Sequence, residues 1–312
     1  MFIVKYCSVR FSFLLSFSIL LSACNSSDDS YCQNATPVEY TGLSIFTNIN
    51  QPVTVLADSD NMLALACHNC YQNNNEFLAD SLYKIESAIV EGADLIELDI
   101  TLSKDKAISF KVSHENESVG VAFDQLIAQP SLVSSEQLLF LEIKDEIETL
   151  KQVRDFLGIL KSHKHPSGRY AYLNDNRFVI IRNIDNNNTL ARFRTVLAEP
   201  DFADIKPYVK LSRLYYKKTE SQMYQEITTA HQCGFHMVEL DLRLGLDVIL
   251  SLNAHAEDLG LAVNVFTLNQ ENYEELMLAL KHDVDIFTIE EGDTFESTGY
   301  SLISYIKQLI NG

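Results

Sequence analysis

Two histidines and three carboxylates at or near the ends of apolar runs are the residues of this sequence best suited to catalysis. His68 ends one run, Glu97 and Asp99 end a second, Glu142 ends a third, and His114 follows a shorter one. Carboxylate oxygens are hard ligands that suit Mg²⁺ or Ca²⁺ better than zinc. An imidazole titrates near neutral pH, so the histidines could act as general base and general acid. Together these residues predict metal-assisted cleavage of a phosphodiester.

Polar neighbours extend each of these clusters. Asn69 follows His68, Glu115 follows His114, and Lys144 lies two residues after Glu142. A lysine there would add a fixed positive charge against phosphoryl oxygens. Each element alone is weak evidence, because a Glu-x-Asp pair is usually a solvated strand end and a lone histidine is usually structural. Their common placement at strand ends favours a functional site.

The elements that must position these residues are strands of a barrel. Apolar runs alternate with helical patterns, which predicts parallel strands joined by helical crossovers. A TIM-type (β/α)8 barrel builds its active site at the C-terminal ends of its strands. The alternative is an open doubly wound sheet, but no glycine-rich nucleotide loop supports it. The candidate strands are Met62–Cys67, Leu95–Ile100, Ile108–Val112, Leu138–Ile143, Phe178–Ile181, Tyr208–Leu211, Met237–Leu242, Ala262–Thr267 and Ile286–Ile289.

Nine candidate strands are one too many for an eight-stranded barrel. Ile108–Val112 follows its predecessor after only a short Lys104-Asp105-Lys106 turn. A connection that short cannot hold a crossover helix, so this run is predicted to form a hairpin at the rim.

One stretch of the sequence echoes another. Gly92–Asp99 resembles Gly234–Asp241, and both end in Glu-Leu-Asp. Alternation along a strand places both carboxylates of each pair on one face. Only the first pair is flanked by other candidate groups, so we assign the metal site to it.

The N-terminus predicts export and lipidation. Residues 1–23 contain Lys5, Arg10 and the apolar stretch Phe11–Leu21, as a secretory signal does. Leu21-Ser22-Ala23-Cys24 resembles the bacterial lipoprotein box, in which Cys24 becomes lipidated. A single spanning helix is the alternative, but the stretch is short for a bilayer. We therefore predict a signal peptide over 1–23, a lipidated tether over 24–40 and a barrel domain over 41–312, anchored at the bacterial cell envelope, with the outer membrane favoured.

Charge and cysteine content limit the partners. The formal charge of −19 becomes −21 once residues 1–23 are removed, which argues against nucleic acid. Cys67-His68-Asn69-Cys70 has the spacing of redox and zinc motifs, but a second metal-ligand pair is missing. The simpler interpretation is that Cys67 is a buried strand residue and Cys70 a small loop residue. Disulfides among Cys32, Cys67, Cys70 and Cys233 are possible, and their pairing is open.

Several motifs of this sequence carry a resemblance to one enzyme family. They are His68-Asn69-Cys70, Asp80-Ser81-Leu82, Gly92–Asp99, His114-Glu115, Leu141-Glu142-Ile143-Lys144, Val263–Asn269 and Val284–Glu290. In that order they resemble the motifs of the glycerophosphodiester phosphodiesterases, members of the barrel superfamily that also holds phosphoinositide phospholipases C. The resemblance spans about residues 62 to 292 and is vague between Asn174 and Cys233.

The resemblance implies a role for each residue. It makes His68 and His114 the catalytic pair, and Glu97, Asp99 and Glu142 the ligands of a divalent metal, Ca²⁺ or Mg²⁺. Asn69 and Lys144 are expected to bind substrate.

The sequence also departs from the family pattern. The family's arginine beside the first histidine is Asn69 here, and its following glycine is Cys70. The tryptophan near the end is Phe266, and the last aspartate is Glu290. His-Asn at the first strand end is closer to the calcium-dependent phospholipases, where the asparagine is a metal ligand.

Three functions follow as hypotheses. The first is hydrolysis of glycerophosphodiesters to an alcohol and glycerol 3-phosphate. The second is phospholipase C- or D-like cleavage of intact phospholipid, for which an exposed aromatic or apolar rim would be evidence. The third is a catalytically impaired barrel that binds phosphate, motivated by the arginine that Asn69 replaces. The expected partners are therefore a small phosphodiester or a phospholipid headgroup, and a membrane through the lipid anchor.

Overall fold

The computed structural model describes the barrel and little of the N-terminal region. The described residues are 32, 35, 54–55, 62–70, 78–103, 109–114, 120–184, 187–281, 283–290 and 301–311. The predicted signal peptide, Cys24, most of the tether and Glu115 lie outside them. Among the described residues, no helix is both long enough and apolar enough to cross a membrane.

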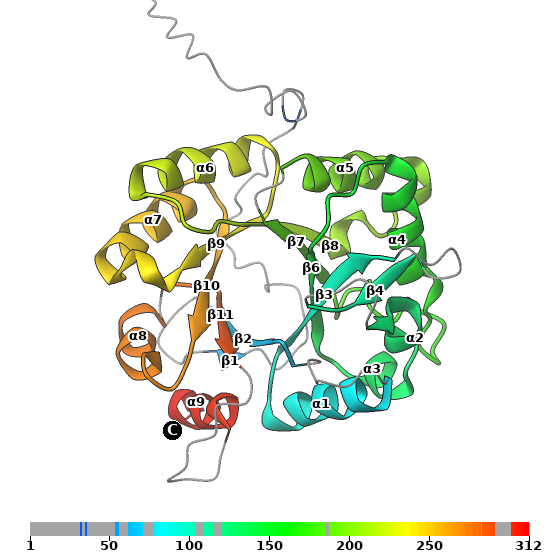
Figure 1. Ribbon diagram of the computed structural model, residues 1–312, viewed down its shortest axis with the longest axis horizontal. Coiled ribbons are helices and arrows are strands. Elements are labelled where there is room, and N and C mark those ends of the chain that lie inside the picture. The colour runs from blue at the N-terminus through cyan, green and yellow to red at the C-terminus, as the bar shows by residue number, and fades with distance from the viewer. Residues whose placement is uncertain are drawn as a thin grey trace, which may run out of the picture.

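Eight parallel strands close into a barrel, as predicted (Figure 1). Each strand pairs in parallel with the next, and β11 pairs with β2 to complete the circle. The barrel strands are β2 (Met62–His68), β3 (Leu95–Leu102), β6 (Leu138–Ile143), β7 (Val179–Ile184), β8 (Val209–Leu214), β9 (Met237–Asp241), β10 (Ala262–Leu268) and β11 (Ile286–Glu290).

Helices surround the barrel and cover its outer face (Figure 1). The longer helices are α1 (Leu78–Glu91), α4 (Leu150–Ser162), α5 (Asn187–Leu197), α6 (Glu220–Gln232), α7 (Leu246–Asp258), α8 (Tyr273–Leu280) and α9 (Leu302–Asn311). Two short ones, α2 (Phe123–Ile127) and α3 (Pro130–Ser134), precede β6, and 3-10 turns span Pro200–Phe202, Lys206–Tyr208 and Leu242–Leu244. Helix α4 shows why they form: a capping box of Thr149 and Gln152 starts it, and one apolar face is buried.

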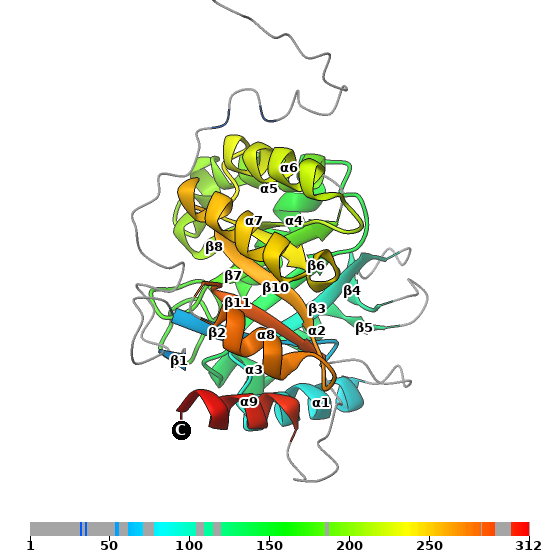
Figure 2. The same cartoon turned by 90° about the vertical axis from the view of Figure 1, so that its left-hand side faces the viewer.

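Three short strands extend the barrel sheet in antiparallel fashion. Strand β4 (Phe110–Val112) pairs antiparallel with β3 and with β5 (Val121–Ala122), while β1 (Thr54–Val55) pairs antiparallel with β2. Figure 2 shows β4 and β5 standing beyond the barrel wall on the right. The predicted rim hairpin is confirmed, and it places His114 two residues after the end of β4.

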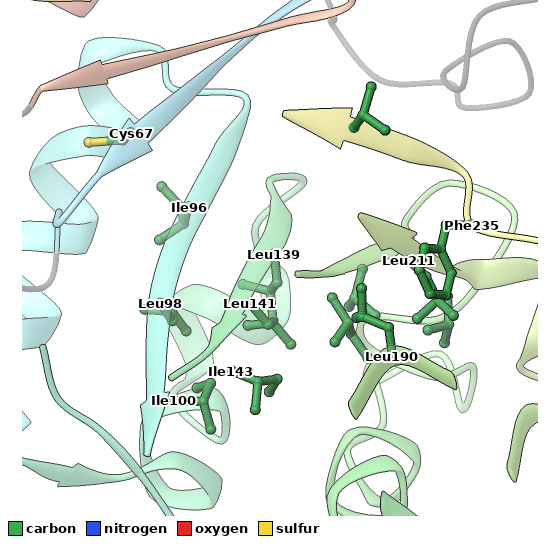
Figure 3. Packing of buried hydrophobic residues seen from close by; sticks show 14 of the residues in the cluster. Cys67, Ile96, Leu98, Ile100, Leu139, Leu141, Ile143, Leu190, Leu211 and Phe235 are labelled. Atoms are coloured by element: carbon green, nitrogen blue, oxygen red, sulfur yellow. The ribbon is translucent and has the colours of Figure 1, made fainter. Parts of the chain in front are cut away.

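The core has two layers because strand side chains alternate between the two faces. Outward side chains pack under the helices, and Figure 3 shows Ile96, Leu98, Ile100, Leu139, Leu141 and Ile143 among them. Inward side chains at the N-terminal end of the barrel form a separate apolar cluster, which includes Ala64, Leu95, Phe140, Ile180 and Met237. The inward positions that follow these along the strands carry polar groups.

Two disulfides join the four cysteines that the structure describes. Cys67 pairs with Cys70 around His68 and Asn69, and both cysteines are buried. Cys32 pairs with Cys233 across 201 residues of sequence, which ties a point of the N-terminal region to the end of α6.

Candidate active site

Three carboxylates converge inside the C-terminal half of the barrel. One oxygen each from Glu97, Asp99 and Glu142 lies within 4.8 Å of the others, and all three side chains are almost fully buried. Alternation turns both acids of β3 inward, and the strand register sets Asp99 opposite Glu142 of β6. The three residues predicted as metal ligands are thus brought together.

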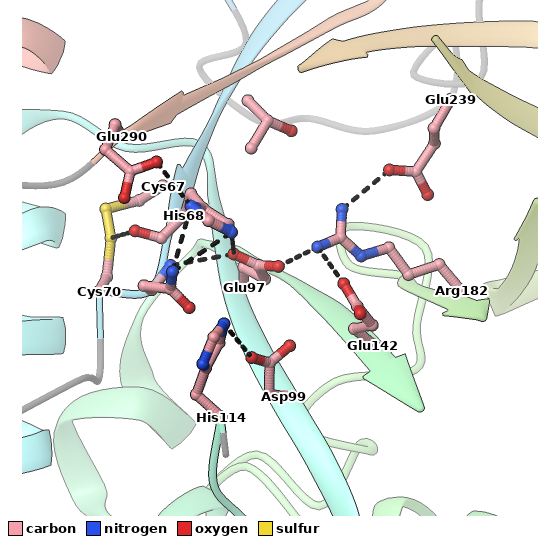
Figure 4. A network of polar contacts seen from close by, with 12 residues as sticks. Cys67, His68, Cys70, Glu97, Asp99, His114, Glu142, Arg182, Glu239 and Glu290 are labelled. Carbon is pink, nitrogen blue, oxygen red and sulfur yellow. Dashed lines mark hydrogen bonds and ion pairs between the residues drawn. A yellow bond between two sulfur atoms is a disulfide. The ribbon is translucent and has the colours of Figure 1, made fainter. Parts of the chain in front are cut away.

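Both predicted catalytic histidines border this cluster (Figure 4). His68, at the end of β2, holds its Nε2 3.8 Å from Oε2 of Glu97. His114, after β4, holds its Nε2 3.9 Å from Oδ2 of Asp99. The two imidazoles approach different acids of the same cluster, so a group bound between them would be within reach of both.

Glu290 of β11 contacts His68 on the side of the imidazole that faces away from the cluster. Its Oε2 lies 2.9 Å from Nδ1 of His68, and the two residues are register partners across the closing strand pair. A carboxylate at Nδ1 favours a proton there, which leaves Nε2 of neutral His68 as the acceptor that faces the cluster. Burial works against the charged imidazole, but the charge of Glu97 and the hydrogen bond to Glu290 outweigh it and raise the pKa of His68.

Asn69 adopts a left-handed backbone conformation, with φ of 55°, inside the small loop closed by Cys67 and Cys70. Its backbone N–H donates to Oε2 of Glu97 at 2.9 Å, and its Nδ2 lies 3.3 Å from Nε2 of His68, the ring nitrogen left as an acceptor. Its buried Oδ1 has no hydrogen-bond partner among the described residues. Asn69 therefore lies within the cluster and offers a carbonyl oxygen there.

Lys144 reaches back into the cluster from the residue after β6. Its Nζ lies 2.7 Å from Oε1 of Glu142 and 3.4 Å from Oδ1 of Asp99. Burial opposes its charge, but these two acids outweigh the burial and raise the pKa of Lys144. Lys144, predicted to bind substrate, is thus a permanent cation beside two of the candidate metal ligands.

Sequence reasoning missed Arg182, a buried side chain that Figure 4 shows joined to three acids. Its guanidinium pairs with Glu97, with Glu142 at 2.5 Å and with Glu239 at 2.8 Å. The sequence-based strand ended at Ile181, whereas β7 continues to Ile184. The available signal was alternation, because Ile180 points inward and Arg182 must point the same way.

The echoing pair on β9 forms no second metal cluster among the described residues. Glu239 accepts hydrogen bonds from Ser212, Asn264 and Arg182. Asp241 pairs with Arg243 and accepts its backbone N–H at 3.0 Å. Assignment of the candidate site to the first pair therefore agrees with the geometry.

The cluster suits a hard divalent cation. Four buried acids face the cations Arg182 and Lys144, so two negative charges are left over when all four acids are ionised. The carboxylate of Asp99 accepts no hydrogen bond from the described residues. Its burial, followed by the charges of Glu97 and Glu142, raises its pKa to about 7. The side-chain oxygens of Asp99 and Asn69 that accept no hydrogen bond from the described residues are the ligand type that Mg²⁺ and Ca²⁺ prefer.

Comparison with known proteins shows the fold. No protein-family model matches this sequence, and no curated protein matches it. A glycerophosphodiester phosphodiesterase from Parabacteroides distasonis is similar in structure, with a TM-score of 0.53 and 15% identity over 80% of this chain and 97% of its own. A putative glycerophosphodiester phosphodiesterase from Galdieria sulphuraria has a TM-score of 0.55 and 11% identity over 81% and 99% of the two chains.

The same barrel also matches a protein of another description. KGPDC from Streptococcus mutans has a TM-score of 0.50 and 12% identity over 80% of this chain and 99% of its own. At identities this low, structural similarity establishes only the fold, a barrel that this chain shares with the glycerophosphodiester phosphodiesterases. The chemistry has to be argued from the side chains.

Proposed function

We propose that this protein is a divergent glycerophosphodiester phosphodiesterase that uses a divalent metal to hydrolyse glycerophosphodiesters to an alcohol and glycerol 3-phosphate. The observation that carries the proposal is the cluster of Glu97, Asp99 and Glu142 between His68 and His114. Similarity of fold to glycerophosphodiester phosphodiesterases supports it at the level of the barrel.

The three acids would hold the metal, with Asn69 beside them. Mg²⁺ or Ca²⁺, when bound, supplies Lewis-acid stabilisation of charge on the phosphoryl oxygens. The other groups act around it. Lys144, which remains charged, would contribute a second positive charge to those oxygens.

Proton transfer would fall to the histidines. His68, with Nε2 as its acceptor, would take the proton from the attacking hydroxyl, which belongs to water or to the substrate's own glycerol. A new bond forms between that oxygen and phosphorus, and the bond from phosphorus to the leaving alcohol breaks. His114 would donate the proton that the leaving oxygen requires. If glycerol attacks, water then opens the cyclic phosphate by the same transfers in reverse.

A second candidate substrate is intact phospholipid. Ile184 and Tyr216 are among the large apolar side chains that are exposed, and they lie at and just after the C-terminal ends of β7 and β8. Apolar and aromatic side chains at that rim are what acyl chains or an interface would contact. The exposed rim therefore favours phospholipid as the substrate, whereas the acids and histidines inside the barrel are suited to the phosphodiester of either substrate.

A substrate panel separates these readings. Purified protein should release glycerol 3-phosphate from glycerophosphocholine or glycerophosphoethanolamine with Mg²⁺ or Ca²⁺, and chelation should abolish the release. If the protein hydrolysed phospholipid in mixed vesicles but no glycerophosphodiester, the assigned substrate would be the phospholipid. The third reading, a non-catalytic phosphate-binding barrel, requires binding without turnover. Metal-stimulated hydrolysis that His68→Ala abolishes would exclude it.

We further propose that the protein is a lipoprotein of the bacterial cell envelope, anchored through Cys24. The support is the sequence of residues 1–24 alone. Metabolic labelling with a radioactive fatty acid should mark the wild-type chain and leave Cys24→Ala unlabelled. Labelling that persists in Cys24→Ala would refute the anchor.

A further inference from the structure

Arg182 is unusual among the groups of the site because it touches three carboxylates and has no place in the proton transfers. It is 3% exposed and lies on the inner face of β7, between the acids of β3 and β6 on one side and that of β9 on the other. Burial opposes its charge, but the surrounding acids outweigh burial and raise the pKa of Arg182 above its ordinary value. Arg182 is therefore a permanent cation with a fixed environment.

The guanidinium pairs with only one oxygen of each of two candidate metal ligands. These oxygens are Oε1 of Glu97 and Oε2 of Glu142. The other oxygen of each carboxylate faces a different group: Oε2 of Glu97 accepts the backbone N–H of Asn69, and Oε1 of Glu142 accepts from Lys144. Occupying one oxygen of a carboxylate fixes the direction of the other, because the group is planar.

The opposite arm of Arg182 is anchored independently. Glu239 accepts from its Nη1 at 2.8 Å, and is itself held by Ser212 at 2.8 Å and Asn264 at 2.9 Å. Asn264 in turn accepts a hydrogen bond from Thr288. A chain of contacts across β7, β8, β9, β10 and β11 thus sets the plane of the guanidinium on the far side of the barrel.

We propose that Arg182, held by Glu239, is a positioning residue that orients Glu97 and Glu142 for metal binding. This inference rests on the proposed function, since it presupposes a metal on the three acids. It also gives the echoing strand end a purpose: Glu239 supports the ligands of the first strand end from across the barrel. Groups that orient metal ligands from outside the coordination shell typically affect affinity 10- to 100-fold, to order of magnitude.

Variants that keep the charge test geometry separately from electrostatics. Arg182→Lys retains one positive charge but lacks the planar fork that spans two carboxylates. Glu239→Asp retains its negative charge but shortens the arm that holds Arg182. Removing the charge of Arg182 would instead change the attraction for any cation, which would confuse the result.

The experiment is a calorimetric titration of the full protein with Mg²⁺ or Ca²⁺, without substrate. We expect Arg182→Lys to bind the metal about 10-fold more weakly, and Glu239→Asp to show a smaller loss in the same direction. The metal concentration for half-maximal hydrolysis should rise by the same factors. Arg177→Lys is the matched control, because Arg177 is equally buried but donates to the backbone carbonyls of residues 132, 133, 137 and 171.

The outcomes are distinct. Unchanged metal affinity in Arg182→Lys, or an equal loss in Arg177→Lys, would overturn the positioning role and leave the proposed function standing. If Arg182→Lys does not fold, Glu239→Asp decides, and unchanged affinity in that variant overturns the role. A wild-type protein that binds neither ion would overturn both the role and the metal-dependent function.

Discussion

The ends of β3 and β9 share a motif but differ in what surrounds it. Both present an inward glutamate followed by an inward aspartate, and both glutamates bind Arg182. The aspartates differ. The carboxylate of Asp99 lies beside Lys144 and His114 and accepts no hydrogen bond from the described residues, whereas that of Asp241 is held by Arg243. The pair of acids is thus common to two strands, and neighbouring strands make one of them a candidate metal site.

The likeness extends to the beginning of each strand. The side chain of Asp94, before β3, accepts the backbone N–H of Leu65 at 2.9 Å. The side chain of His236, before β9, accepts the backbone N–H of Leu211 at 3.1 Å. Each therefore joins its strand to the preceding one, and burial lowers the pKa of His236 to about 3, so it is neutral. At the start of each strand, Asp94 and His236 therefore have the same role, which is to join two neighbouring strands.

The largest expected difference between the two strand ends is in activity. Asp99→Asn should reduce kcat/KM by about 10³-fold, because loss of a metal ligand removes several kcal/mol of transition-state stabilisation. Asp241→Asn should leave kcat/KM nearly unchanged. Steady-state hydrolysis of a glycerophosphodiester measures both. Equal losses in the two variants would mean that β9 contributes to the chemistry as much as β3 does.

The second difference concerns stability against pH in protein stripped of metal. A folded-state pKa of about 7 for Asp99, above its ordinary value of 3.8, means that the folded protein binds this proton more tightly than the unfolded chain does. Its contribution to stability is present below pH 4 and is lost as pH rises through 7. Between pH 5 and 8, Asp99→Asn should gain stability relative to wild type by about 2 kcal/mol. Urea unfolding at both pH values, with a chelator, provides the test, and parallel pH curves would contradict it.

A third prediction concerns His68, which flanks only the first strand end. Glu290→Gln removes the charge at Nδ1, so the pKa of His68 should fall. If neutral His68 is the base, the acidic limb of the kcat/KM profile should move to lower pH. Because the imidazolium formed during reaction is less stabilised, kcat should fall about 10-fold, part of what a general base contributes. An unmoved acidic limb would show that another group sets it.

The smallest expected difference between the two copies is at the strand starts, where both changes should affect stability and not activity, and Asp94→Ala also removes the acceptor of Lys307. Asp94→Ala and His236→Ala each leave a backbone N–H of the preceding strand without its acceptor. Each should lower the free energy of unfolding by about 1–3 kcal/mol and leave kcat/KM unchanged. Thermal and urea unfolding measure the first, and steady-state kinetics the second. A large loss of activity in folded Asp94→Ala would place that end of β3 in the site.

Much of the architecture was predictable because local patterns encode it. Continuous apolar runs between helical patterns predicted parallel strands, and the short turn before Ile108 predicted a hairpin that the structure confirms. Glu97 and Asp99 could be assigned to one face from alternation alone, and placement at strand ends predicted that they would meet Glu142. The fold class is confirmed, whereas the lipid anchor and the substrate stay predictions.

What escaped prediction depends on which strands become neighbours when the barrel closes. Glu290 meets His68 across 222 residues of sequence, and Glu239 meets Arg182 across 57. An arginine near a strand end reads as solvated until the partners that bury it are known. The cysteine pairs were open for the same reason, since composition does not specify distance.

The sequence was therefore sufficient for the barrel and for the acids and histidines at its rim, because strand period and chain order are properties of short segments. Only the folded chain decided that the carboxylate of Asp99 accepts no hydrogen bond from the described residues while that of Asp241 is held by Arg243, and that Arg182 joins the two echoing strand ends. Those differences depend on tertiary contacts, because Arg182 of β7 meets acids of β3, β6 and β9 in one buried space where charge and burial select the role of each group.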